Sequence, residues 1–174
     1  MCSSDLKTFP YRGKGLKIAA LEEALTALPD RRFQIEIKGN AELAEAVVAV
    51  VLKVGAVDRV LLASANADSV DAVRRLAPTA PLCYSIQGAT RLLSQLRNGQ
   101  WPKYQPAADV LTMPPSMLQT LSITPEELKT IRTKGIFLQY FTINKPEEMQ
   151  RLLQAGADSI ITDRPDLLAE VLTR

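Results

Sequence analysis

Apolar positions along this chain follow two spacings in turn, and the pair of spacings repeats. Short apolar runs suited to buried strands are each followed by a stretch with apolar residues three and four positions apart, as in amphipathic helices. Such a rhythm is typical of parallel strands joined by helical crossovers. The predicted strands end at intervals of 26, 21, 28, 29 and 20 residues, near Lys38, Ser64, Ser85, Met113, Thr142 and Thr162.

The number of these units decides between two architectures. Six parallel strands can form an open doubly wound sheet, whereas a TIM barrel needs eight. A helical stripe over residues 19–28 precedes the first predicted strand and has no strand of its own. We therefore predict an α/β fold of the TIM-barrel type that is incomplete, with six parallel βα units and the first two strands missing.

Helix starts are marked by capping residues. Asn40 precedes a valine-rich helical stripe, and Thr124-Pro125-Glu126-Glu127 has the pattern of a capping box with proline at the first helical position. Asn144, before Lys145-Pro146-Glu147, repeats this pattern. We predict that Asn144 and Asp163 cap helices, with a role in a pocket as the alternative.

The first predicted strand carries a charged pair. Glu36 and Lys38 lie two residues apart in a segment rich in isoleucine, and alternate residues of a strand point to the same face. Burial of both charges would be costly unless they were paired or coordinated. Spacing alone leaves two interpretations open: a solvated charged edge, or a polar cleft that holds an anionic ligand.

Composition narrows the class of protein. The 174 residues are 47% hydrophobic and 23% charged, which suits one globular domain, and a net charge of +2 with no basic cluster argues against nucleic acid as a partner. The apolar run from Ala46 to Val57 is broken by Lys53 and Gly55, so we expect no membrane span. The chain contains no histidine, and therefore no imidazole for acid–base chemistry.

Several segments resemble, in order and spacing, the C-terminal three quarters of glycerophosphodiester phosphodiesterases. They are Ile35–Lys38, Ser64, Tyr140–Asn144 and Gly156–Pro165, of which the closing Thr-Asp-Arg-Pro is the most specific. The resemblance implies that residues 7–174 are a partial domain of this family. We expect residues 1–6 to be a non-native or disordered start, because Cys2–Leu6 reads as one translated frame of a common sequencing adapter.

The resemblance also implies site residues. Glu36 would be a metal ligand, Lys38 would contact a phosphate and Phe141 would form one wall of the substrate pocket; no residue of this chain is assigned a catalytic acid or base. The cofactor implied for the complete enzyme is a divalent cation, Ca²⁺ or Mg²⁺. The family's N-terminal His-Arg-Gly, Glu-x-Asp and His-Asp motifs are absent.

The leading hypothesis is a fragment of a metal-dependent phosphodiesterase. The complete enzyme would hydrolyse small-molecule glycerophosphodiesters to glycerol 3-phosphate and an alcohol, and we expect this chain alone to be inactive. One alternative is a non-catalytic α/β module that binds a phosphorylated ligand or a protein partner. Another is an unrelated doubly wound domain, which a Glu36 side chain pointing outside the sheet would support. We expect a cytoplasmic location, although a missing N-terminus would leave export compatible with the sequence.

Overall fold

The computed structural model describes residues 18–173 and forms two small sheets of parallel strands. The predictions for residues 1–6 lie outside the described residues. The strands are β1 (Phe33–Glu36), β2 (Val60–Ala63), β3 (Val110–Met113), β4 (Phe137–Tyr140) and β5 (Ser159–Ile160). The helices are α2 (Leu21–Ala27), α3 (Ala41–Lys53), α4 (Ala67–Leu76), α5 (Ile86–Arg97), α6 (Ser116–Thr120), α7 (Pro125–Arg132), α8 (Pro146–Gln154) and α9 (Pro165–Leu172), with short 3-10 turns η1 (Val57–Arg59) and η2 (Trp101–Lys103).

The two sheets are joined by a segment that forms isolated bridges in place of a strand. Strand β1 pairs with β2, and β3 pairs with β4, which pairs with β5. Between them, Leu82 bridges to Leu62 and Cys83 bridges to Val110, both in parallel. The predicted strand at 81–85 is thereby reduced to two isolated bridges, because Pro81 has no N–H to donate and Ser85 already caps α5.

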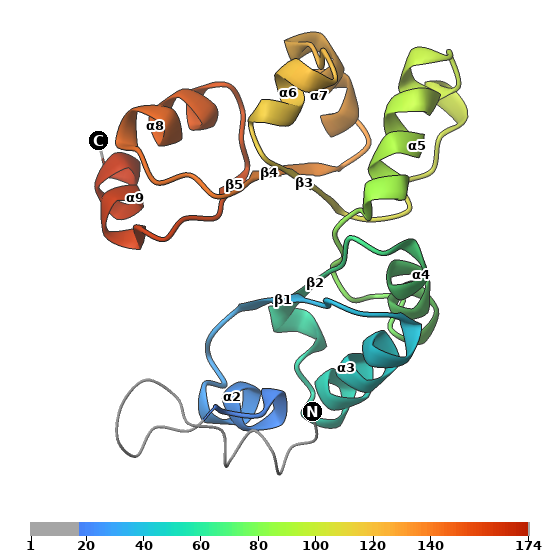
Figure 1. Ribbon diagram of the computed structural model, residues 1–174, viewed down its shortest axis with the longest axis vertical. Coiled ribbons are helices and arrows are strands. Elements are labelled where there is room, and N and C mark those ends of the chain that lie inside the picture. The colour runs from blue at the N-terminus through green and yellow to red at the C-terminus, as the bar shows by residue number, and fades with distance from the viewer. Residues whose placement is uncertain (1–17, 174) are drawn as a thin grey trace.

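Strands and helices form two layers of an open arc (Figure 1). The strands lie on the inner side and the helices on the outer side, with α2 and α9 at the two ends of the arc. Most buried apolar side chains, among them Leu62, Leu138 and Met149, pack between the two layers. A separate small cluster consists of Ala63, Cys83 and Val110. The helix-covered face of the sheets is therefore the main hydrophobic core.

The capping predictions divide into correct and incorrect ones. Asn40 accepts a hydrogen bond from the Leu43 N–H at 3.2 Å, and Thr124 and Glu127 form the reciprocal capping box of α7, as predicted. The predicted caps at Asn144 and Asp163 are wrong, because Lys145 and Arg164 occupy the N-cap positions and neither side chain caps. Instead, the Asn144 amide donates to Asp163 at 2.9 Å and ties the ends of two neighbouring strand segments together.

Candidate functional site

A cavity of about 500 Å³ lies at the carboxyl ends of the parallel strands. Its lining includes Glu36, the last residue of β1, and the residues that directly follow the next three strands: Ser64 after β2, Pro114 after β3 and Phe141 after β4. In α/β proteins the side chains at this edge are held by rigid strands while the adjoining loops vary, which is why ligand sites gather there. A second hollow of about 510 Å³ beside it shares Gln34 and Glu36 and reaches Ile160 and Thr162.

Of the three site residues predicted from the sequence, two line this cavity. Glu36 and Phe141 are lining residues, and Phe141 is 37% exposed. Lys38 is not among the lining residues; its ammonium lies 3.4 Å from a Glu36 carboxylate oxygen, with 78% of its side chain exposed. The pair therefore stays together, as the two-residue spacing predicted, but only the carboxylate faces the cavity.

Two buried serines hold the backbone around Lys38. The Ser64 hydroxyl donates to the carbonyl of Ile37 at 2.8 Å, and the Ser69 hydroxyl donates to the carbonyl of Gly39 at 2.9 Å. Both serines are at most 5% exposed, so these hydrogen bonds are shielded from water. Ser64 also accepts the N–H of Asn66, which makes it a loop hydroxyl that fixes the strand end.

A pair of amides connects two strands that belong to different sheets. Gln34 and Gln139 exchange two hydrogen bonds of 3.0 Å, and Gln139 also donates to the Ser159 hydroxyl at 3.1 Å. Gln34 lies on β1 and Gln139 on β4, so this pair connects the two sheets. Neither glutamine is among the residues predicted from the sequence, although Gln34 lies two positions before Glu36 and therefore on the same strand face.

The protonation of two groups that line the cavity is set by burial. Desolvation, with a contribution from the negative charge of Asp109, raises the pKa of the Cys83 thiol to about 12. Desolvation and a hydrogen bond from Tyr104 raise the pKa of Tyr84 above its ordinary value of 10.0. Both groups therefore stay neutral near pH 7, and the thiol is not a nucleophile.

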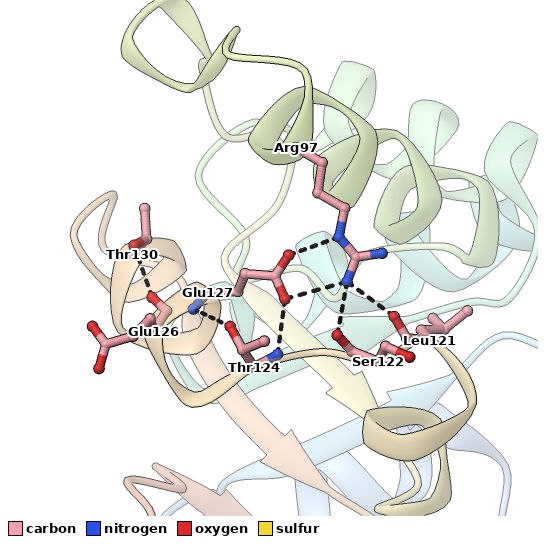
Figure 2. Close-up of polar contacts among 7 residues, drawn as sticks. All are labelled: Arg97, Leu121, Ser122, Thr124, Glu126, Glu127 and Thr130. Atoms are coloured by element: carbon pink, nitrogen blue, oxygen red, sulfur yellow. Dashed lines mark hydrogen bonds and ion pairs between the residues drawn. The ribbon is translucent and has the colours of Figure 1, made fainter.

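One wall of the cavity is anchored by an arginine (Figure 2). The Arg97 guanidinium on α5 contacts both carboxylate oxygens of Glu127, at 2.7 and 3.2 Å. It also donates to the carbonyls of Leu121 and Ser122, at 2.9 and 3.2 Å. These contacts hold the segment between α6 and α7 against α5, and Leu121 of that segment lines the cavity.

The donor set within residues 18–173 does not make a complete site for a divalent cation. Hard cations such as Ca²⁺ and Mg²⁺ take several oxygen ligands, usually from more than one carboxylate. Glu36 is the only carboxylate among the residues that line the cavity, and no group of three or more Asp, Glu, His or Cys side chains in the described range could hold a metal ion. The nearby Lys38 ammonium adds positive charge to the same place.

A carboxylate in a cavity at the carboxyl ends of parallel strands places the chain among α/β proteins with sites at that edge. Solved structures share this fold. A glycerophosphodiester phosphodiesterase from Parabacteroides distasonis matches with a TM-score of 0.74 at 19% identity, over 98% of this chain and 70% of that one. An Oleispira antarctica phosphodiesterase in complex with the product sn-glycerol-3-phosphate matches with a TM-score of 0.64 at 18% identity, over 88% and 61% of the two chains.

Sequence comparison identifies the family. The profile of the glycerophosphoryl diester phosphodiesterase family matches residues 4–167, so the chain belongs to that family. The probable glycerophosphodiester phosphodiesterase 2 of Mycobacterium tuberculosis is 33% identical over 167 residues, which cover 92% of this chain and 62% of the relative. The family predicted from the segments around Glu36, Phe141 and Asp163 is confirmed, and the alternative of an unrelated α/β domain is wrong.

Two further observations concern the extent of the match and the helices. The chain spans less than two thirds of the length of the curated relatives it matches. Across residues 18–173, no helix combines the length and the apolar character that crossing a membrane would require.

Proposed function

We propose that this chain forms part of a metal-dependent phosphodiesterase that hydrolyses glycerophosphodiesters to glycerol 3-phosphate and an alcohol. The observation that carries the proposal is the Glu36 carboxylate, which faces a cavity at the carboxyl ends of the strands in a chain of this family. The sn-glycerol-3-phosphate bound to the phosphodiesterase of similar fold is the product that such a reaction would release.

In this proposal each site residue has a distinct task. Glu36 is one ligand of a divalent cation, Ca²⁺ or Mg²⁺, whose other donors come from outside the described residues. Lys38 acts as a point charge on the phosphate; its exposed, flexible side chain can reach an anion near Glu36. Phe141 provides an apolar wall for the glycerol or the alcohol portion of the substrate, since its ring lines the cavity.

Hydrolysis of a phosphodiester also needs a base for the attacking oxygen and an acid for the leaving alkoxide. The sequence offers no imidazole, and Cys83 and Tyr84 are held neutral by burial. We therefore propose that residues 1–174 alone are inactive and that the acid and the base come from outside this sequence.

The proposed architecture is a TIM-type barrel of which this chain supplies six βα units. The strands follow one another around the arc in chain order, and the parallel bridges at Leu82 and Cys83 give the shortest unit its place between β2 and β3. In this proposal the first two strands of an eight-stranded barrel are missing and would lie between β5 and β1. The share of the relatives' length that the chain covers supports this view.

A second candidate is a non-catalytic module that binds a phosphorylated ligand or a protein partner. Among the described strands, β1 pairs on one side only, as does β5, and unpaired edges are ready templates for strand addition. Binding of sn-glycerol 3-phosphate without turnover, both by this chain and by the longest natural reading frame that contains it, would favour this candidate.

The test measures release of glycerol 3-phosphate from glycerophosphocholine in the presence of Ca²⁺ or Mg²⁺. We expect no turnover by residues 1–174, and turnover by a longer natural reading frame that includes them. In that longer protein Glu36→Gln should abolish turnover, because the carboxamide is neutral and is a poorer ligand for a hard cation. Glu42→Gln, on the exposed first turn of α3, is the matched control and should retain it.

Two results would overturn parts of this proposal. Turnover by the 174-residue chain that Glu36→Gln abolishes would show that the chain itself contains a working acid and base. Full activity of the longer protein after Glu36→Gln would show that Glu36 is not a ligand in the site. That conclusion would hold even though the chain belongs to the family.

A further inference from the structure

The cavity at Glu36 extends well beyond the strand ends. Its far part is lined by side chains of α5, of α6 and of the segment that follows α6: Ile86, Ala89, Leu93, Met117, Leu121 and Ile123. Leu111 and Met113, which belong to the main core, also line it. The cavity therefore runs from the inner side of the strands into the layer between the strands and helices α5 and α6.

The chemistry of the lining changes along this path. Glu36 is the only charged residue among the lining residues of the described chain, and the hydroxyls of Ser64 and Thr142 lie at the same strand-end region. The lining residues on α5 and α6 are aliphatic side chains and methionine, apart from Thr90, whose hydroxyl already donates to the carbonyl of Ile86 at 3.0 Å within α5. A positively charged alcohol such as choline would lose its hydration there without gaining an anionic partner, because Glu36 lies at the other end.

One polar atom in the lining lacks a partner. The hydroxyl oxygen of Thr112 is buried and makes no hydrogen bond within the described residues, although Thr112 lines the cavity. A buried hydroxyl without a partner is costly, and a ligand oxygen can remove that cost. Thr112 lies on β3, so it marks where the polar part of a ligand meets the apolar part of the cavity.

The apolar part is also held open in advance of a ligand. Arg97 binds the carbonyls of Leu121 and Ser122 and the Glu127 carboxylate, so the wall formed after α6 is fixed to α5 (Figure 2). A preformed apolar cavity costs a ligand little ordering free energy on binding. Its volume of about 500 Å³ lies within the range of small-molecule sites, roughly 300–1,000 Å³.

We propose that this apolar cavity binds an alkyl chain carried by the phosphodiester substrate, so that the preferred substrate is an amphiphile. The phosphate lies at Glu36 and Lys38, and the alkyl chain of the substrate extends past Thr112 between α5 and α6. This inference rests on the proposed function for the position of the phosphate. The alkyl chain can belong to the leaving alcohol or to the glycerol. The ligands used below carry it on one side or the other and so distinguish these two positions.

The first experiment measures binding of non-micellar glycerophosphodiesters to the 174-residue chain by titration calorimetry. The ligands are the methyl, butyl and octyl esters of glycerol 3-phosphate, with an octyl ether on the glycerol of glycerophosphocholine as the second arm. We expect affinity to rise roughly fourfold for each buried methylene until the cavity is full. The arm that shows this rise identifies which side of the phosphate carries the chain.

Two variants, each with a control variant, test whether the alkyl chain lies in this cavity. Ala89→Leu fills the space beside α5 and should reduce the affinity for the octyl ester at least tenfold, with the affinity for the methyl ester unchanged. Its control is Ala49→Leu on the exposed face of α3, which should change neither affinity. Ile86→Asn should weaken only the long ligands, because Ile86 lines the cavity yet is 67% exposed and adds little to folding. Its control is Leu52→Asn, at a position 50% exposed on α3.

The outcomes separate this inference from the proposed function. Equal affinity for methyl and octyl esters in both arms would overturn the alkyl-chain site, even if the longer protein hydrolyses glycerophosphocholine. A chain-length dependence that Ala89→Leu and Ile86→Asn leave intact would also overturn it. Both variants could remove the dependence of affinity on alkyl-chain length while the longer protein never hydrolyses a diester. That combination would support the alkyl-chain site and refute the proposed phosphodiesterase.

Discussion

The contacts of Arg97 allow a quantitative prediction about stability. Replacing Arg97 by methionine keeps an unbranched apolar stem on α5 but removes the guanidinium and its contacts to Glu127, Leu121 and Ser122. Exposed ion pairs are worth roughly 0.2–1 kcal/mol, and hydrogen bonds to charged groups roughly 1.5–3 kcal/mol. The side chains of Arg97 and Glu127 are 42% and 19% exposed, so the pair is intermediate.

We therefore expect Arg97→Met to lower the free energy of unfolding by about 1–2 kcal/mol. Urea unfolding followed by circular dichroism measures this loss, with an unchanged slope showing that the folded state is still compact. Arg91→Met on the same helix is the control, because Arg91 is exposed and has no hydrogen bond or ion pair among the described residues. A difference of less than about 0.3 kcal/mol between the two variants, the usual error of additivity, would refute the reasoning.

The pH dependence gives an independent check on the same pair. The hydrogen bond from Arg97, with smaller help from the Thr124 N–H, holds the pKa of Glu127 below its ordinary value of 4.5. A lowered folded-state pKa stabilises the protein above the ordinary value, and this stabilisation is lost as the pH falls through the folded-state pKa. The gap in unfolding free energy between the wild type and Arg97→Met should therefore be constant at neutral pH and shrink below pH 4.5. A gap that stays constant into acid would mean that the Glu127 charge contributes nothing.

Two further predictions concern the buried side chains of Gln139 and Cys83. Gln139→Leu should destabilise the chain by about 0.5–1.5 kcal/mol, because it removes hydrogen bonds to Ser159 and to the Gln34 amide, which is exposed and can bond to water instead. The double variant Gln34→Leu/Gln139→Leu should lose less stability than the sum of the two single variants in the same urea assay, and additive losses would contradict the paired-amide account. In a Cys2→Ser background, Cys83 should react with a thiol reagent at pH 8 only as fast as the chain opens, since burial raises its pKa to about 12; rapid reaction of the folded protein would show that the thiol is accessible.

Much of the local structure could be predicted from the sequence because it depends on near neighbours. Helix α3 begins at Asn40 and α7 at the Thr124 box, as predicted, since a cap requires only residues two or three positions apart. The same rule failed at Asn144 because its side chain found Asp163, which lies 19 positions later in the chain. A competing partner that the chain brings close only by folding is not visible in local spacing.

In the candidate site too, some features could be predicted from the sequence and others could not. The sequence by itself determined the parallel βα rhythm, the family, and the pairing of Glu36 with Lys38, which lie two residues apart. The strand itself ends at Glu36, two residues earlier than predicted, so Lys38 lies in the segment that follows β1. Only the tertiary structure decided that the carboxylate faces a cavity while Lys38 does not, because that depends on where β2, β3 and β4 end around it. The Gln34–Gln139 pair and the Arg97 contact to Leu121 likewise join segments far apart in the chain. Cavities and long-range polar pairs arise from packing between elements, and a linear pattern does not encode those distances.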